Sequence, residues 1–296
     1  MAVLGILIVH GMGAQRPTFA DGLINDLDGL LRKAGVDSNA VAWQPAYWAS
    51  VLNAREEALW NDLSKNNDLD QGKLRRFVLN ALGDAVAYKR TDGDEGGVYD
   101  KIHDVVNHHL RALREQLGGA DRPIVVIAHS LGAVIMSDYI WNEQHPGSRA
   151  RGSHPLDKME TLCGMVTFGC NIPLFTLALD TVRAIEFPPT SLPDPIKAAA
   201  RWYNYYDPDD ILGWPLKPLS PSYDLAVSQD IAINVGGFFT SWNPASHGEY
   251  WTDNSFTHPV AELITKLVAV APTLQPAVVA PAAPFPKAKR KRKTKS

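Results

Sequence analysis

The sequence predicts an α/β fold, with a mostly parallel sheet covered by helices on both of its faces. Two observations carry this prediction. Short apolar runs rich in Val and Ile alternate with longer segments whose apolar residues recur at helical spacing, a pattern typical of βαβ units. The most apolar run, residues 124–127 (IVVI), has the composition of a strand buried on both faces, as the strands of parallel sheets are.

In chain order, the first strand is expected at residues 4–9, and it leads into a loop at 10–13 (HGMG). An amphipathic helix over 19–31 follows, and Gly35 is its expected stop. A second strand is expected at 41–48. Pro45 within it cannot donate to a ladder, which predicts an edge strand or an early end.

The middle of the chain is predicted to be helical. Residues 50–90 carry two helical patterns separated by the polar loop 66–72. Aromatic residues are concentrated at 43–60 and 202–251, and most are expected in the core; the alternative is an apolar acyl pocket or a helical cap within 50–97. The strongest amphipathic pattern covers 98–117. The remaining expected elements are strands at 162–168, 201–206 and 230–235 and a closing helix at 260–270.

Composition separates a folded body from a basic end. We expect one domain over residues 1–271, followed by a Pro/Ala-rich linker and a disordered basic tail over 272–296. Seven basic residues between 287 and 295 contribute +7 to a net charge of −3, which leaves −10 on the rest of the chain. Contact with an anionic membrane or nucleic acid is therefore expected only of the tail. No specific protein partner is predicted.

Cysteine usage and hydropathy bear on the compartment. Cys163 and Cys170 are too few for a disulfide framework, which favours a reducing, cytoplasmic setting. The apolar N-terminus lacks a positive leading region and is interpreted as a strand, not a signal peptide. No run of about 18 apolar residues occurs, so no membrane span is predicted.

Residues 128–132 (AHSLG) join the strand at 124–127 to the helical pattern that begins at Leu131. A chain that passes from strand to helix within one or two residues bends sharply, and the residue at the bend projects outward. The positions two before and two after it must be small, and here they are Ala128 and Gly132. The stretch therefore predicts a nucleophile elbow with Ser130 as the reactive hydroxyl.

A serine nucleophile needs a histidine base oriented by a carboxylate, in the chain order Ser, acid, His for an elbow enzyme. The run 207–210 (DPDD) follows a predicted strand and offers Asp207 and Asp210. His247, flanked by Ser and Gly in a late loop, is preferred as the base over His258, which precedes a proline.

These motifs together resemble the α/β-hydrolase superfamily, specifically its lipase/esterase-like members, over residues 4 to about 271. The resemblance implies an α/β-hydrolase fold and an oxyanion hole formed by the backbone N–H groups of Met12 and Leu131. It favours Asp210 as the acid, because the aliphatic pair after it can anchor the loop, while Asp207 is expected to cap the turn. Departures are Ala128 in place of the first elbow glycine and the lack of a long HGGG motif.

The function expected is that of a serine hydrolase, a carboxylesterase or lipase, acting on a small-molecule or lipid ester. Thioesterase or phospholipase chemistry would use the same triad, and a noncatalytic binding protein of the same fold is the alternative from another class. No cofactor is expected: Gly11 and Gly13 are a partial dinucleotide fingerprint, but Arg16 replaces its third glycine. No cluster of Cys, His and carboxylates has metal-binding spacing.

Overall fold

The computed structural model of the protein describes residues 1–13, 15–65, 67, 70–89, 96–147, 149–235 and 250–271. The expected linker and tail at 272–296 lie outside the described residues, as does part of the polar loop expected at 66–72. Among the helices that are described, none is long and apolar enough to cross a membrane.

The centre of the fold is a parallel sheet in which the described residues form six strands, in the order β2-β1-β3-β4-β5-β6. Pro45 lies in the edge strand, as its missing N–H predicts. The second strand ends two residues earlier than expected, and the last covers 229–232 instead of 230–235. The strands are β1 (Leu4–Val9), β2 (Val41–Ala46), β3 (Ile124–His129), β4 (Leu162–Phe168), β5 (Arg201–Tyr206) and β6 (Gln229–Ala232).

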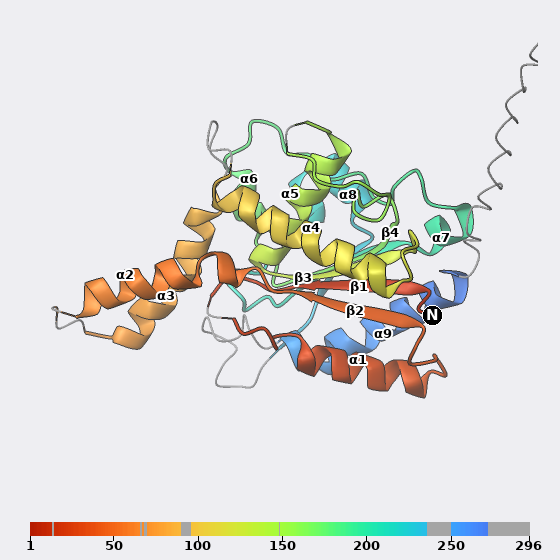
Figure 1. The fold of residues 1–296 in the computed structure, drawn as a ribbon, viewed down its shortest axis with the longest axis horizontal. Coiled ribbons are helices and arrows are strands. Elements are labelled where there is room, and N and C mark those ends of the chain that lie inside the picture. Colours follow the sequence, from red (N-terminus) through yellow and green to blue (C-terminus); the bar gives the residue numbers. More distant parts are fainter. Residues whose placement is uncertain are drawn as a thin grey trace, which may run out of the picture.

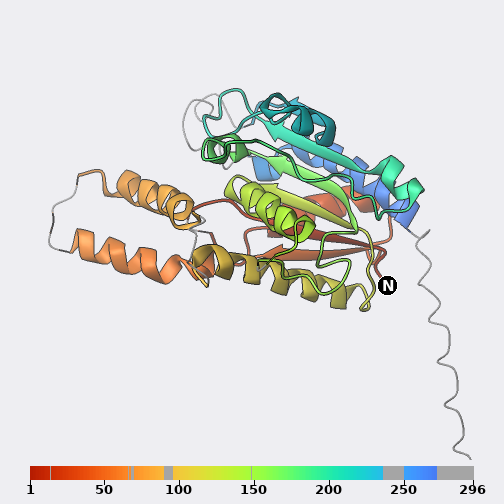
Figure 2. The ribbon, with the colours of Figure 1, turned by 90° about the horizontal axis from the view of Figure 1, so that it is seen from above.

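Helices cover both faces of this sheet, as Figures 1 and 2 show. The long helices and the hairpin fall where the spacing of apolar residues predicts them, whereas α6, α7 and α8 were not expected. The closing helix begins six residues earlier than expected, with Pro259 inside it. The helices are α1 (Asp21–Lys33), α2 (Asn53–Ser64), α3 (Gly72–Ala87), α4 (Val98–Gln116), α5 (Leu131–Gln144), α6 (Ile172–Thr176), α7 (Asp194–Ala199), α8 (Pro221–Ala226) and α9 (Asn254–Val270), with 3-10 turns at Ala49–Val51 and Lys217–Leu219.

Side chains that alternate along each strand divide the core into two layers. In β1, Leu4, Ile6 and Ile8 face the layer beneath α1 and α9, while Leu7 and Val9 face the layer beneath α4 and α5. All of these strand residues are fully buried. Burial of such side chains contributes about 1.5–3 kcal/mol each, and it fixes the sheet register because a slip of one residue would exchange the two faces.

Helices α2 and α3 form a hairpin that leaves the body of the protein. The hairpin extends from the end of the sheet at which β1 and β3 finish, as both views show (Figures 1 and 2). No residue of α2 is buried. The hairpin is the pair of helices expected within 50–90; that it serves as a cap stays a prediction.

Candidate active site

The strand order reverses between β1 and β3, because β1 connects to β2 on one side of it and β3 lies on the other. In open parallel sheets the loops after two such strands diverge and leave a crevice at the carboxyl edge. The 10–13 loop follows β1, and Ser130 follows β3. The fold therefore brings two of the sequence motifs to the place where such sheets form binding sites.

Ser130 occupies a strained bend between β3 and α5. Its backbone has φ 51° and ψ −124°, a region that side-chain-bearing residues rarely adopt and that costs of order 1–3 kcal/mol. Its N–H donates to the carbonyl of Phe168 at 3.0 Å, and its own carbonyl accepts from the Ala133 N–H at 2.9 Å. Ser130 is fully buried.

Gly132 and Gly11 show why the bend demands small residues. A Cβ at Gly132 would lie 2.5 Å from the carbonyl oxygen of His10, and one at Gly11 would lie 2.7 Å from the Cβ of Ser130. Real Cβ atoms do not approach other atoms so closely, and the first of these neighbours is backbone, which cannot turn away. The 10–13 loop thus packs directly against the elbow.

His10 fixes the start of that loop from beneath. Its Nε2 accepts from the Trp48 N–H at 3.1 Å, and its carbonyl accepts from the Trp48 indole N–H at 2.9 Å. The two rings stack with centroids 4.7 Å apart. Burial lowers the pKa of His10 to about 4, so the imidazole is neutral and its Nδ1 donates to the Gly11 carbonyl at 2.8 Å.

The expected oxyanion donors lie on the two sides of the bend. Met12 belongs to the 10–13 loop, and Leu131 is the first residue of α5, where backbone N–H groups have no partner within the helix. Within the described part of the chain, neither N–H donates to another backbone group. Helix N-termini of this kind attract negative charge.

Asp207 and Asp210 both follow β5 and are both buried. Both carboxylate oxygens of Asp207 accept hydrogen bonds from backbone N–H groups. Oδ1 accepts from the Asp209 N–H at 2.8 Å, and Oδ2 accepts from the Val235 N–H at 2.7 Å. Such contacts hold a turn together. Asp207 therefore ties the end of β5 to the segment that follows β6.

Asp210 has a different environment, formed largely by one tyrosine. The Tyr250 hydroxyl donates to Asp210 Oδ2 at 3.0 Å and accepts from the Asp207 N–H at 2.8 Å. Asp210 Oδ1 accepts from the Leu212 N–H at 2.9 Å. A Cβ at Gly213 would lie 2.6 Å from Asp210 Oδ2, so a glycine there allows the carboxylate to approach. Burial raises the pKa of Tyr250, which keeps its proton on the oxygen.

Three histidines bear on the expected triad: the preferred base, its alternative and the neighbour of the nucleophile. His247 lies outside the described residues, three positions before Tyr250. His258 lies exposed on α9. His129, next to the nucleophile, is buried with its ring 4.8 Å from that of Phe168 and 5.5 Å from that of Trp251.

Two contacts near these motifs were not predicted from the sequence. One is the Tyr250 hydroxyl between the two aspartates, and the other is Asp84 of α3, whose Oδ2 accepts from the Gly13 N–H at 2.7 Å. Neither had a signal in the sequence, since Tyr250 was one of many aromatic residues expected in the core and Asp84 one acid in a helical pattern. Both cysteines are buried, and burial raises the pKa of Cys170 to about 12. In the described segments, no group of three or more His, Cys, Asp or Glu could hold a metal ion.

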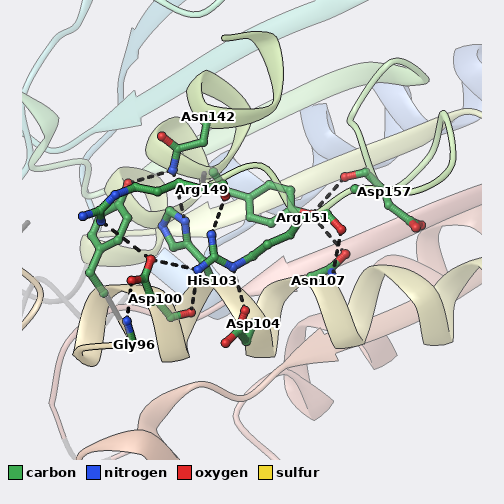
Figure 3. A network of polar contacts seen from close by, with 12 residues as sticks. Gly96, Asp100, His103, Asp104, Asn107, Asn142, Arg149, Arg151 and Asp157 are labelled. Atoms are coloured by element: carbon green, nitrogen blue, oxygen red, sulfur yellow. Dashed lines mark hydrogen bonds and ion pairs between the residues drawn. The ribbon is translucent and has the colours of Figure 1, made fainter. Parts of the chain in front are cut away.

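A polar network joins α4 to α5 and to the loop that follows α5 (Figure 3). His103 of α4 is its buried centre: Nε2 is 2.8 Å from the Tyr88 hydroxyl, which also donates to Asp138 of α5 at 3.1 Å. Burial lowers the pKa of His103 to about 3, so the ring is neutral. Arg151 pairs with Asp100 at 2.8 Å and closes the network from the following loop. Tyr88 comes directly after α3, so the network anchors the base of the hairpin.

The hairpin also carries an apolar groove of about 800 Å³, whose lining includes Trp60, Leu63, Leu79, Leu82 and Val86. Trp60 is the one aromatic residue among the described residues that line this groove. Most of the other aromatic residues that are described pack in the core, among them Trp48, Trp202 and Tyr250.

The reversal of strand order and the strained serine between β3 and α5 agree with the α/β-hydrolase fold expected from the sequence. No protein-family model matches the chain, and no curated protein matches it. Among solved structures, the chain is similar to a dienelactone hydrolase from Anabaena variabilis, with 13% sequence identity and a TM-score of 0.37 over 90% of this chain and 86% of that one. At that TM-score, the assignment of the fold rests on the strand order and the elbow.

Proposed function

We propose that the protein is a serine hydrolase that cleaves carboxylic esters through an acyl-enzyme on Ser130. The observation that carries the proposal is the backbone of Ser130, held at φ 51° where β3 meets α5 and packed against the 10–13 loop. Proteins keep strain of this kind where the surrounding structure imposes it, and functional sites are the usual place. An elbow presents its hydroxyl beside the N–H of the next residue, here Leu131.

In the proposed reaction, Ser130 Oγ forms a bond to the ester carbonyl carbon while His247 takes the hydroxyl proton. The carbonyl electron pair moves onto oxygen, and the Met12 and Leu131 N–H groups stabilise that oxyanion. Each such donor is worth about 3–4 kcal/mol of the barrier. The oxyanion then expels the alcohol, which takes the proton from His247. Water resolves the acyl-enzyme by the same steps in reverse.

Asp210 is proposed as the carboxylate that orients His247. Its support is the difference between the two aspartates: both oxygens of Asp207 accept backbone N–H groups, whereas Asp210 accepts one backbone N–H, from Leu212, and one side-chain hydroxyl, from Tyr250. Asp207 is thus committed to the turn. Tyr250, whose hydroxyl donates to Asp210 Oδ2 at 3.0 Å, lies three positions after His247 in the sequence.

The proposal is tested by hydrolysis of p-nitrophenyl esters of rising chain length, with an acyl-thioester and a phospholipid run beside them. Ser130→Ala is expected to abolish turnover, and Asp210→Asn to lower kcat by about 10⁴-fold by favouring the wrong imidazole tautomer. Asp207→Asn is the matched control and is expected to retain most of the activity. The reverse result for the two aspartates would make Asp207 the acid.

A folded wild-type protein that hydrolyses none of these substrates would favour the noncatalytic alternative, a binding protein of the same fold. If the protein hydrolyses the thioester or the phospholipid in preference to the simple esters, the proposed triad still applies and the proposed substrate class is wrong.

A further inference from the structure

The base of the hairpin touches the candidate oxyanion loop through one carboxylate. Asp84 lies one turn before the end of α3 and is 2% exposed. Its Oδ2 accepts from the Gly13 N–H at 2.7 Å, across 71 residues of sequence. Gly13 has φ +95°, a backbone conformation that glycine adopts readily and that other residues rarely do.

We propose that Asp84 is a positioning residue for the oxyanion hole: it fixes Gly13, and through Gly13 it orients the preceding peptide that carries the Met12 N–H. This inference rests on the proposed function, because the orientation of Met12 matters to catalysis only if its N–H holds an oxyanion. Positioning matters at this site because hydrogen-bond donors stabilise a transition state only when they already point at the developing charge.

Asp84 is itself held firmly from the body of the protein. Tyr88, one helical turn later, donates its N–H to the Asp84 carbonyl at 2.9 Å. The Tyr88 hydroxyl in turn contacts His103 of α4 and Asp138 of α5. Since α5 begins at the residue after Ser130, this chain of contacts joins the nucleophile helix to the oxyanion loop through α3.

A second carboxyl group faces Asp84 from the other helix of the hairpin. Glu56 of α2, whose Oε1 is buried, shares a side-chain hydrogen bond with Asp84. Burial, together with the neighbouring Glu56, raises the pKa of Asp84 to about 8. Burial also raises the pKa of Glu56, although the hydrogen bond with Asp84 and the charge of Arg76 both act to lower it. The pair therefore shares a proton at neutral pH, which leaves Asp84 Oδ2 as the acceptor for Gly13.

The test compares two substitutions with a control on the same hairpin. Asp84→Ala removes the acceptor and is expected to lower kcat for a p-nitrophenyl ester about tenfold while KM stays within about twofold. Asp84→Asn keeps an oxygen that can accept from Gly13 and is expected to stay within about threefold of wild type. Asp62→Ala, an exposed acid on α2, is expected to have no effect.

The Gly13 amide gives a readout that does not depend on activity. In ¹⁵N-glycine-labelled wild type, assigned with Gly13→Ala, its NMR shift is expected to titrate with a midpoint near pH 8 and to be constant in Asp84→Asn. This measurement tests the contact between Asp84 and Gly13 even if Asp84→Ala fails to fold.

Three results would overturn the inference: an unchanged kcat in folded Asp84→Ala, an equal loss in Asp84→Asn and Asp84→Ala, or a Gly13 shift that does not respond to Asp84. Failure of the proposed function is distinguishable from these. If wild-type protein has no hydrolase activity but its Gly13 amide shift still titrates, the contact between Asp84 and Gly13 exists and Asp84 has no catalytic role.

Discussion

Replacing Ser130 with glycine should make the protein more stable than replacing it with alanine. Both variants lack the hydroxyl, so their difference isolates the backbone conformation at φ 51° and ψ −124°. Alanine keeps the Cβ and hence a strain of about 1–3 kcal/mol. Glycine removes that strain, at a cost of about 0.5–1 kcal/mol for its greater freedom in the unfolded chain. The net expectation is a free energy of unfolding about 1 kcal/mol higher for Ser130→Gly.

The assay is thermal and urea unfolding of the two variants in parallel. A difference of about 1 kcal/mol corresponds to roughly 2–4 °C in Tm for a domain of this size. The matched control is Ala58→Gly, at an exposed position inside α2, where glycine should instead lower stability by about 1 kcal/mol. The order of alanine and glycine is thus expected to reverse between the two sites. If glycine is no more stable than alanine at position 130, the strain on which the elbow is argued does not exist.

Three other expectations follow from the same contacts. Gly132→Ala should lower the free energy of unfolding, measured by urea denaturation, by about 1–3 kcal/mol or more, because its Cβ would lie 2.5 Å from a backbone carbonyl oxygen. Gly29→Ala, with open space around the new Cβ, should instead raise the free energy of unfolding by about 0.5–1 kcal/mol. Tyr250→Phe should lower the free energy of unfolding by about 1–3 kcal/mol and reduce kcat, since it leaves the buried Asp207 N–H and Asp210 Oδ2 without the hydroxyl. Tyr203→Phe is the control, and an equal loss of stability and kcat in that variant would contradict a specific role for the Tyr250 hydroxyl. The free energy of unfolding of wild type, relative to that of Asp84→Asn, should fall as pH rises from about 4 to 8, by at most about 1.4 kcal/mol per pH unit. The reason is that the folded state keeps a proton on Asp84, which the unfolded chain releases near the usual pKa of an aspartate. A constant difference across this range would refute the raised pKa of Asp84.

The parts of the fold that the sequence predicts are those with a local physical cause. The strand at 4–9 and the helix over 98–117 have long, regular apolar patterns, and Pro45 marks the edge strand through its missing N–H. The bend at Ser130 is also local, because its small neighbours follow from a close approach that any such turn requires. Each of these elements can therefore be predicted from a few consecutive residues.

What the sequence does not predict depends on long-range contact or on elements too short to have a period. Helices α6, α7 and α8 have five or six residues each, fewer than two turns, so no apolar face repeats. The contact of Asp84 with Gly13 joins positions 71 apart, and that of Tyr250 with Asp210 joins positions 40 apart. Only the packing of the hairpin and of the loop after β5 brings these groups together.

The central claim is that Ser130 is a nucleophile, and covalent labelling tests it most directly. Wild-type protein is incubated with an alkyl fluorophosphonate, and the adduct is located by peptide mass spectrometry. The account predicts one modified residue, Ser130, with no labelling of Ser130→Ala or of heat-unfolded protein. A folded wild type that is never labelled at Ser130, or that is labelled equally after unfolding, would contradict it.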